Sequence, residues 1–421
     1  MINSKNIYIH RELEEKIAPF LKRREVLAIL GPRQAGKTTF LEYLTKELQQ
    51  EKKKVKFITF EKRTDLDLFN ASIEDFKALI EDYDCVIIDE FQYAKEGGKA
   101  LKYLYDTAKV KFIISGSSSL ELTFQTGKYM VGRMIDFTLL PFSFREFLAA
   151  KDEDTRRILE RKKFDDLFQF NHRHSFGAEV NRRLIRLLEE YALFGGYPAV
   201  VLAEGIEEKK KVLENIAEKY LLREIKDLLR LATDDELRRL ERFLAGQIGN
   251  MVRYEELSLS SGLSRQEVKK HLNILEKTYI LSLIRPFFTN RRIELVKNPK
   301  VYFDDLGLRN ASINDFRRLT ARNDAGAVME NYAFQLLRKL YGENIKFWRT
   351  KSKAEVDFII EKDGQIYPVE VKYGSKRIVG KSLYSFIEKF KPPIALVLTK
   401  DYIGEEKSGK TKIKFIPLPY F

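Results

Sequence analysis

Residues 25–44 read EVLAILGPRQAGKTTFLEYL, and this stretch decides the fold of the first third of the chain. Its apolar start (25–30) is typical of a buried strand, and the amphipathic run that follows Lys37 is typical of a helix. Between them, residues 31–38 match G-x-x-x-x-G-K-[ST], in which the glycines let the backbone wrap a phosphate at the start of a helix. The sequence therefore predicts a phosphate-binding loop (P-loop) for ATP.

The residue types of this loop and of a second motif, CVIIDE (85–90), indicate individual roles. Lys37 would bridge the β- and γ-phosphates, and the Thr38 hydroxyl would hold Mg²⁺. Asp89, at the end of an apolar strand, would bind the same ion, and Glu90 would act as the catalytic base that polarises water. The predicted nucleotide-binding residues are Gly31, Pro32, Arg33, Gln34, Ala35, Gly36, Lys37, Thr38, Thr39 and Asp89, with Thr38 and Asp89 as metal ligands.

Two further polar positions are candidates for the nucleotide site. Ser117 lies in a serine-rich run (115–119) that ends the next apolar strand, where a hydroxyl could sense the γ-phosphate or could simply cap a helix. Arg133 could reach a phosphate of its own subunit or of a neighbouring one, or could be an ordinary exposed arginine.

Short β-rich runs alternate with helical or loop segments through the first 150 residues. The runs are EVLAIL (25–30), VKFITF (55–60), CVIID (85–89), KFIIS (111–115) and MIDFTLL (134–140). Buried strands that alternate with helices are typical of a parallel, doubly wound sheet. The sequence therefore predicts an α/β P-loop NTPase domain over residues 1–150.

The rest of the chain changes pattern twice more. Residues 151–235 carry long amphipathic helical stretches, separated by a turn at FGGYP (194–198), and predict a helical lid or bundle. Residues 236–325 predict a winged helix, with three helices followed by a β-hairpin. Residues 326–421 predict a helix and several strands, which form a separate, smaller α/β domain.

The third helix of the predicted winged helix carries a polar face that could enter a DNA major groove. This face comprises Arg265, Gln266, Lys269, Lys270, Asn273 and Lys277, and Arg291 and Arg292 at the hairpin tip could bind phosphates. The alternatives are a solvated surface or a surface that packs against the ATPase core.

Acidic residues recur through the last hundred residues. Glu370 and Lys372 alternate onto one face of a strand, and pairing with the preceding strand brings Asp357 alongside. Carboxylates there suit Mg²⁺ or Mn²⁺, and Lys372 would orient or activate water. Glu355 shares a face with Asp357, so these residues alone leave the metal ligand open. Glu370 and Lys372 could instead form a surface ion pair.

Several segments together resemble a family of AAA+-related prokaryotic ATPases, common in archaea and also found in bacteria. The segments are GPRQAGKTT (31–39), VIIDEFQ (86–92), FIISGSSS (112–119), GRMIDFTLLPFSFREF (132–147) and FGGYP (194–198). The resemblance implies an AAA+-like core that binds adenine nucleotide, followed by a winged helix and a C-terminal domain. By analogy, an AAA+-like core also implies a homo-oligomer, as a ring or dimer with an arginine supplied in trans.

The C-terminal order also resembles the PD-(D/E)XK nuclease superfamily, with a helical acid, an acid on one strand, and E-x-K on its hairpin partner. This resemblance implies a restriction-endonuclease-like α/β domain in which Glu330, Asp357 and Glu370 bind metal. It favours Asp357 over Glu355, and it implies that Asp357, Glu370 and Lys372 are catalytic.

Composition bears on partners and location. The net charge of +14 suggests a polyanionic partner, most obviously DNA, although a thermophilic source would explain the 33% of charged residues equally well. A single cysteine, Cys85, excludes an intrachain disulfide and a cysteine-based zinc cluster. No apolar run approaches the roughly 20 residues that span a bilayer, and residues 1–16 are too charged for a signal peptide. A cytoplasmic protein without membrane contact is expected.

Three functions fit these patterns. The leading hypothesis is an ATPase that acts on DNA through its winged helix, with a metal-dependent nuclease-like C-terminal domain. The second is a nucleotide-gated switch that works through protein contacts and carries a vestigial, non-cleaving nuclease domain. The third is a toxin-like defence or mobile-element nuclease regulated by ATP.

Overall fold

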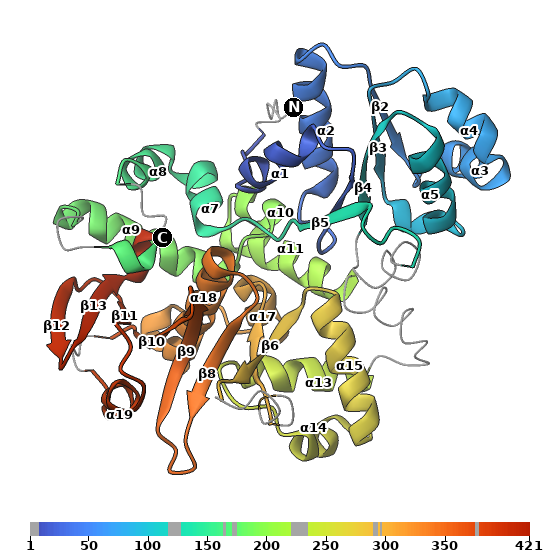
Figure 1. The fold of residues 1–421 in the computed structure, drawn as a ribbon. Coiled ribbons are helices and arrows are strands. Elements are labelled where there is room, and N and C mark those ends of the chain that lie inside the picture. Colours follow the sequence, from blue (N-terminus) through green and yellow to red (C-terminus); the bar gives the residue numbers. More distant parts are fainter. Residues whose placement is uncertain are drawn as a thin grey trace. The chain divides into compact units, whose positions relative to one another are not determined.

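The structure is a computed structural model that describes residues 8–116, 128–162, 166–170, 175–219, 235–288, 294, 297–374 and 379–421. The chain divides into two compact units. The first unit is Met1–Glu146 with Lys277–Ile280, and the second is Phe147–Glu276 with Leu281–Phe421. The two units appear in sequence colours in Figure 1, and each is described by itself below.

The first unit is built on a five-stranded sheet with the strand order β2-β3-β4-β1-β5. All neighbouring strands pair in parallel, which confirms the predicted parallel α/β fold. The strands are β1 (Val26–Leu30), β2 (Val55–Thr59), β3 (Cys85–Asp89), β4 (Lys111–Gly116) and β5 (Met134–Thr138).

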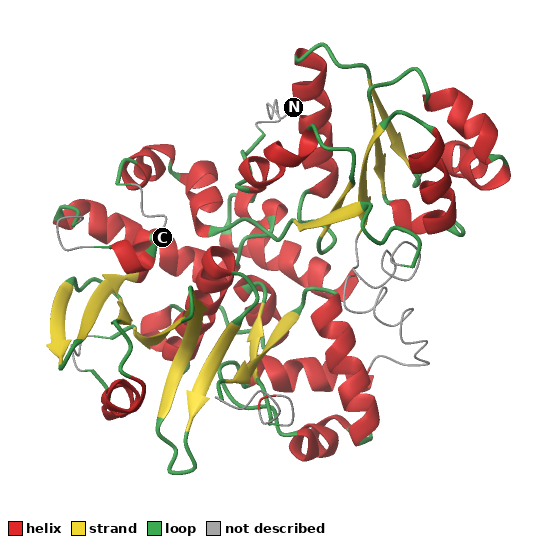
Figure 2. Ribbon diagram, viewed as in Figure 1, coloured by secondary structure: helices red, strands yellow, loops and turns green. Residues whose placement is uncertain are grey.

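Helices cover both faces of this sheet (Figure 2). They are α1 (Leu13–Leu21), α2 (Lys37–Gln50), α3 (Arg63–Ala71), α4 (Ile73–Ile80), the short η1 (Phe91–Tyr93) and α5 (Gly97–Thr107). Leu27 and Ile29 of β1 pack with α1 and α2 on one face. Ala28 and Leu30 pack with α3, α4 and α5 on the other. Alternation along a doubly covered strand therefore explains why every residue of β1 is apolar.

The second unit contains most of the helices. They are α7 (Phe144–Lys151), which begins in the first unit, α8 (Glu153–Glu160), α9 (Ala178–Phe194), α10 (Pro198–Leu202), α11 (Ile206–Lys219), α13 (Asp235–Gly246), α14 (Tyr254–Ser261), α15 (Arg265–Lys277), α17 (Leu306–Ser312), α18 (Ala325–Tyr341) and α19 (Lys381–Phe390). The predicted FGGYP turn separates α9 from α10, and Gly195 adopts a left-handed φ of +73° there. Short 3₁₀ helices lie at η2 (Leu167–Gln169), η5 (Leu319–Ala321) and η6 (Leu418–Tyr420).

An eight-stranded sheet organises the rest of the second unit, in the order β12-β13-β11-β10-β9-β8-β6-β7. The strands are β6 (Leu281–Pro286), β7 (Lys300–Phe303), β8 (Ile345–Arg349), β9 (Glu355–Lys362), β10 (Gln365–Lys372), β11 (Ile394–Thr399), β12 (Gly404–Ser408) and β13 (Thr411–Pro417). Strands β8, β9 and β10 run antiparallel to one another, and β11 then pairs in parallel with β10. Figure 1 shows strands β8 to β13 of this sheet in orange and red, with α18 and α19 beside them.

The predicted hairpin after the third helix is present, because β6 and β7 pair antiparallel. It is not a free-standing wing, because β6 also pairs in parallel with β8 through Arg285 and Pro286. The hairpin therefore continues the C-terminal sheet. Arg291 and Arg292 at its predicted tip lie outside the described residues. The division of the chain into four domains stays a prediction.

The length and hydropathy of the helices bear on membrane contact. Over the described ranges, none of them combines the length and the apolar character that crossing a bilayer requires.

Candidate functional site

The predicted P-loop links β1 to α2. Its backbone needs glycine at both ends of the motif. A Cβ on Gly31 would stand 2.1 Å from the Leu139 carbonyl oxygen, and Gly36 has a left-handed φ of +92° where it begins α2. Gln34 also has a positive φ, +62°. Positive φ angles at Gln34 and Gly36 curl the backbone, as in loops whose successive N–H groups bind an anion.

Lys37 is held over the loop itself. Its Nζ donates hydrogen bonds to the carbonyl oxygens of Gly31 and Pro32, both at 3.0 Å, and the residue is only 5% exposed. Arg33 extends toward the neighbouring 3₁₀ turn and donates to the Tyr93 hydroxyl at 3.3 Å. The two carbonyl contacts therefore hold the Lys37 ammonium against the backbone of the loop that would bind a phosphate.

Polar side chains from three elements converge beside the loop. Thr38, at the start of α2, donates its hydroxyl hydrogen to Asp89 Oδ2 at 2.6 Å. The Ser115 hydroxyl donates to the other carboxylate oxygen of Asp89. The Glu90 N–H in turn donates to Ser115 Oγ at 3.0 Å. Thr38, Asp89 and Glu90 are thus brought together as the sequence predicted, and Ser115 joins them.

Glu90 has an unusual backbone. Its φ of +55° and ψ of +43° lie in the left-handed region, which is uncommon for a residue with a Cβ and recurs at functional sites. Its side chain accepts a hydrogen bond from Gln92 Nε2. Ser117, the predicted sensor, lies outside the described residues.

Arg133 is not brought to the loop of its own chain. It directly precedes β5, and the register pairs Val26 with Met134 at the amino ends of β1 and β5. The P-loop follows the carboxyl end of β1, roughly 16 Å along the strand at about 3.3 Å per residue. The Arg133 guanidinium instead lies 3.3 Å from Asp106.

Sequence reasoning missed Arg11. Its Nη1 donates to the Ala35 carbonyl within the P-loop at 3.0 Å, and its Nη2 donates to the Leu140 carbonyl at 2.6 Å. Its Nε lies 3.1 Å from Glu146, and its guanidinium stacks over the Phe142 ring, 4.8 Å from the centroid. Arg11 is 5% exposed, so it braces the loop from inside the protein. The charged segment in which it lies carries no motif that could have identified it.

The C-terminal acidic residues form a second cluster. Asp357 on β9 and Glu370 on β10 lie on antiparallel neighbours whose register pairs Val369 with Phe358. The Val371 N–H donates to Asp357 Oδ2 at 2.8 Å. Burial raises the pKa of the Asp357 carboxyl to about 8, the Glu330 carboxylate adds to the rise, and a nearby lysine opposes it. The predicted order of helical acid, strand acid and E-x-K therefore converges in space.

Glu370 and Lys372 form an ion pair, with Nζ and Oε1 2.6 Å apart. Glu370 is 4% exposed, and its Oε2 is buried without a hydrogen-bond partner in the part of the chain that the structure describes. Gly380 gives this side chain room, because a Cβ there would stand 2.6 Å from Glu370 Oε1.

A lysine that the sequence did not single out lies inside the same cluster. Lys300 on β7 places its Nζ 3.2 Å from Glu330 Oε1 and 2.6 Å from Glu355 Oε1. The Tyr302 hydroxyl also donates to Glu330 Oε1, at 2.6 Å. Arg349 Nη1 donates to Glu355 Oε2 at 2.8 Å. Among the described residues, no group of three or more acidic, histidine or cysteine side chains is arranged to hold a metal ion.

Helix α15 bears out its predicted faces. Arg265, Gln266, Lys269, Lys270, Asn273 and Lys277 are exposed, while Val268, Leu272 and Leu275 are buried. The helix begins with a capping box, in which Glu267 accepts from the Ser264 N–H at 2.8 Å and the Glu267 N–H donates to Ser264 Oγ at 3.3 Å. The basic and amide-bearing face of α15 is therefore exposed.

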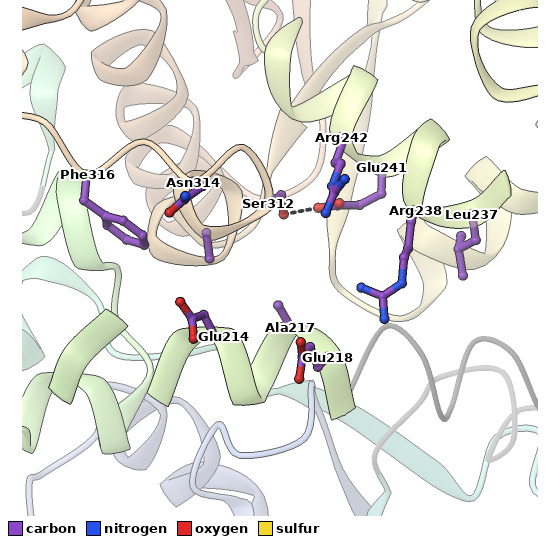
Figure 3. Close-up of a pocket in the computed structure, with 11 residues that line it drawn as sticks. Glu214, Ala217, Glu218, Leu237, Arg238, Glu241, Arg242, Ser312, Asn314 and Phe316 are labelled. Atoms are coloured by element: carbon purple, nitrogen blue, oxygen red, sulfur yellow. Dashed lines mark hydrogen bonds between the residues drawn. The ribbon is translucent and has the colours of Figure 1, made fainter. Parts of the chain in front are cut away.

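A cavity of about 190 Å³ lies between α11, α13 and the segment after α17. Figure 3 shows the carboxylates of Glu214, Glu218 and Glu241 around it, together with two arginines of α13. None of the residues predicted for the nucleotide or nuclease-like sites lines this cavity.

Three family matches divide the chain. Residues 23–148 match the family described as AAA domain. Residues 185–318 match a domain of unknown function (DUF8612), and residues 325–421 match another (DUF4143). Together with the parallel sheet and the P-loop, the first match defines residues 23–148 as an AAA-type P-loop ATPase domain that binds nucleotide.

Similar proteins occur in both bacteria and archaea. An uncharacterized protein of Haemophilus influenzae is 25% identical over 387 residues, which cover 89% of this chain and 87% of that protein. An uncharacterized protein of Methanocaldococcus jannaschii is 24% identical over 366 residues, covering 84% of this chain and 75% of that protein. A third, from Mycobacterium tuberculosis, is 24% identical over 380 residues, covering 89% and 76%.

Solved structures with partial similarity include a replication initiator and a helicase. The replication initiator DnaA bound to AMPPCP and single-stranded DNA matches with a TM-score of 0.30 and 12% identity, covering 64% of this chain and 90% of that one. The Pif1 helicase of Candida albicans matches with a TM-score of 0.26 and 13% identity, covering 43% and 48%. Scores of this size do not establish a shared overall fold.

Proposed function

We propose that the protein is a cytoplasmic ATPase of the AAA+ type that hydrolyses ATP and acts on DNA. The observation that carries the first half is the contact between the Thr38 hydroxyl and Asp89 Oδ2, 2.6 Å apart beside the P-loop. A hydroxyl and a carboxylate so placed suit Mg²⁺, a hard cation that prefers oxygen ligands and is commonly shared with nucleotide phosphates. Bound Mg²⁺ would neutralise phosphate charge there.

The residues of the chain would divide the work. Lys37 exchanges the carbonyl oxygens of Gly31 and Pro32 for phosphate oxygens, and the N–H groups of residues 31–39 surround the phosphates. Glu90 orients the attacking water. The hydrogen bond from the Glu90 N–H to Ser115 Oγ holds the backbone of Glu90 in place. Ser117 senses the γ-phosphate, and Arg133 acts in trans within a homo-oligomer.

ATP turnover of the Lys37→Ala and Glu90→Gln variants tests this proposal. Each change should lower the turnover rate by about a hundredfold or more, because a charge-stabilising group or the water-orienting carboxylate is lost. Lys46→Ala is a matched control, since Lys46 lies on the same helix but is exposed. A Lys37→Ala protein that turns over ATP at the wild-type rate would refute the assignment of the site.

The proposed action on DNA rests on the net charge of +14 and on the exposed basic face of α15. DNA should stimulate ATP hydrolysis, and the stimulation should fade with salt because binding releases counterions. Lys270→Ala should weaken DNA binding and reduce the salt slope by about one. Lys410→Ala, an exposed lysine outside α15, should leave both unchanged. ATP turnover that is indifferent to DNA would contradict this half of the proposal.

For the C-terminal domain we propose a nuclease-like fold, supported by the convergence of Glu330, Asp357, Glu370 and Lys372. Supercoiled and linear DNA incubated with Mg²⁺ or Mn²⁺ tests for cleavage, with Asp357→Ala and Lys37→Ala as controls. Cleavage that Asp357→Ala abolishes would establish a nuclease, and the Lys37→Ala sample would show whether ATP controls it.

A second candidate function is a nucleotide-gated switch whose nuclease-like domain does not cleave DNA. The observation that favours it is Lys300, because its ammonium already contacts two of the carboxylates in the cluster. This candidate expects ATP hydrolysis with no DNA cleavage in either metal.

A further inference from the structure

The C-terminal carboxylate cluster is assembled from four elements of the second unit. Helix α18 supplies Glu330, strand β9 supplies Glu355 and Asp357, and strand β10 supplies Glu370. Strand β7 supplies Lys300, whose side chain is 2% exposed. A charged side chain is rarely buried this far unless it is paired. The ion pairs with Glu330 and Glu355 therefore account for the presence of Lys300 in the interior.

The position of Lys300 is fixed by its backbone. On one side it pairs with Ile284 of β6, and on the other it forms an isolated bridge with Met251. The Val301 carbonyl accepts from the Gly249 N–H at 2.9 Å, which anchors the same stretch. Pairing on both sides leaves the side chain to point into the cluster. The ammonium is therefore placed by the sheet and not by a freely rotating surface chain.

The Lys300 ammonium contacts one carboxylate oxygen of Glu330 and one of Glu355. Glu330 Oε1 is shared by Lys300 Nζ at 3.2 Å and by the Tyr302 hydroxyl at 2.6 Å. Glu355 contacts Lys300 through one oxygen and Arg349 through the other, at 2.6 and 2.8 Å. A divalent ion bound to either carboxylate at about 2.0–2.6 Å would lie within a few ångströms of the ammonium, where like charges repel strongly.

Asp357 and Glu370, the two remaining carboxylates, also have partners within the protein. Asp357 Oδ2 already accepts from the Val371 N–H, and Glu370 Oε1 pairs with Lys372. Glu370 Oε2 is buried and has no hydrogen-bond partner among the described residues. The Lys300 ammonium lies against Glu330, and no three carboxylates of the described residues are arranged to hold a metal ion. The donor set therefore does not fit a divalent cation bound through Glu330, Asp357 and Glu370 together.

We infer that the Lys300 ammonium is the resident cation of this cluster and takes the place of a divalent metal ion at Glu330. The C-terminal domain then keeps its carboxylates neutralised without metal. The inference rests on the proposed nuclease-like fold and deepens the second candidate function, because a cluster that binds no divalent cation lacks the metal on which this type of cleavage depends.

Binding of Mn²⁺ to the full chain without nucleotide tests the inference, with free Mn²⁺ measured by its paramagnetic resonance signal. Wild-type protein and Asp357→Asn should bind the same number of ions, because the cluster contributes none. Lys300→Met should gain one bound ion per chain, because the substitution removes the positive charge beside Glu330 and Glu355. Adding Glu330→Gln to Lys300→Met should abolish this gain, and Lys300→Arg, which keeps the charge, should gain none.

Two outcomes would overturn the inference. One is a bound Mn²⁺ in wild-type protein that Asp357→Asn or Glu330→Gln removes. The other is a folded Lys300→Met protein, checked by circular dichroism, that gains no ion. If Lys300→Met does not fold, the comparison of wild type with Asp357→Asn decides alone. ATP turnover and its stimulation by DNA, measured on the same samples, report the proposed function separately from metal binding.

Discussion

Glu241 on α13 illustrates how one buried group can make stability depend on pH. It is 3% exposed, and the Ser312 hydroxyl lies against its Oε1 (Figure 3). That hydroxyl has one hydrogen but also lies 2.9 Å from the Leu308 carbonyl oxygen. If the hydrogen goes to the carbonyl, the hydroxyl oxygen can accept a hydrogen bond from a protonated Glu241. Burial raises the pKa of Glu241 to about 7, in keeping with this arrangement.

The sign of the pH effect follows from this raised pKa. A group whose pKa is higher in the folded than in the unfolded protein stabilises the fold at low pH, and this contribution is lost as pH rises through the folded value. The rise of the pKa from 4.5 to about 7 corresponds to roughly 3 kcal/mol. Glu241→Gln should therefore raise the melting temperature at pH 8.5 much more than at pH 5.

Thermal unfolding at both pH values measures this effect. Glu207→Gln is the control, because Glu207 is exposed on the neighbouring helix α11. Equal shifts of the Glu241→Gln melting temperature at the two pH values would contradict the raised pKa.

Arg11 gives a second prediction at this scale. Arg11→Lys removes the guanidinium that donates to the carbonyls of both Ala35 and Leu140. An unsatisfied buried carbonyl costs about 1–3 kcal/mol. Because Ala35 lies in the P-loop, we expect ATP to bind about tenfold or more weakly. Titration with a fluorescent ATP analogue measures the affinity. Arg24→Lys, an exposed arginine that also donates to a backbone carbonyl, should bind ATP as wild type does.

The residues of the nucleotide site that could be predicted from sequence lie in short motifs. The P-loop and the pair Asp89–Glu90 follow directly from strands, so their spacing reveals them. Arg11 and Lys300 act on groups that are distant in sequence, and each lies in an ordinary charged stretch. Only the fold brings them to their sites, because burial and pairing are properties of the folded chain.

At the scale of elements, the FGGYP turn is explained by the packing of α9 against α17. Asp305 accepts from the N–H groups of Gly196 and Leu308, both at 2.8 Å. Asn310 Nδ2 donates to two carbonyls at the end of α9, each at 3.0 Å. A Cβ on Gly307 would stand 2.0 Å from the Phe194 carbonyl oxygen. The two helix ends therefore approach so closely that no side chain fits at Gly307.

The stability of Gly307→Ala distinguishes the effect of this close approach from the effect of helix propensity. Alanine is favoured over glycine inside a helix by up to about 1 kcal/mol, so propensity alone would stabilise the variant. We expect the opposite, a loss of about 1–3 kcal/mol in the free energy of unfolding, because the two backbones must move apart. Urea denaturation measures it.

Gly326→Ala on α18 is the matched control, because a Cβ there meets nothing within 4 Å. It should change the free energy of unfolding by less than about 1 kcal/mol in either direction. A Gly307→Ala protein as stable as the Gly326→Ala protein would show that the helices are not in close contact.

At the scale of the whole molecule, the strands β6 and β7 bind the middle of the second unit to its C-terminal part. A chain that ends after Ala321 would remove β8 from β6 and Glu330 from Lys300, which leaves an unpaired strand edge and an unpaired buried ammonium. We expect α13, α14, α15, β6 and β7 to lose hydrogen-exchange protection in this truncated chain. Nucleotide binding by the first unit, which has its own two cores, should persist.

Hydrogen exchange followed by mass spectrometry distinguishes the outcomes. Amides of α13–α15 that stay protected after truncation would indicate an independent winged helix, as the sequence predicts. The full-length chain, measured in parallel, sets the level of protection expected for the folded unit.

The sequence predicted the order of strands and helices well at this scale, and the pairing of distant strands poorly. Alternation of buried strands with helices was enough to predict the parallel sheet of the first unit. The hairpin after α15 was also predicted, but its pairing with β8 depends on Arg285 and Pro286 meeting Lys346 and Phe347. No local pattern encodes such a contact, because β6 and β8 would have the same sequence pattern if each were the edge strand of its own sheet.

The pairing of the β6–β7 hairpin with β8 of the C-terminal sheet has a consequence for how the two regions are inherited. The DUF8612 match ends at residue 318 and the DUF4143 match begins at residue 325. Lys300 and Tyr302 lie in the first region, and their partner Glu330 lies in the second. A genetic exchange that replaced one region alone would bring a lysine without its carboxylates or the carboxylates without their lysine. The two regions are therefore expected to be inherited as one piece and to change together at these positions.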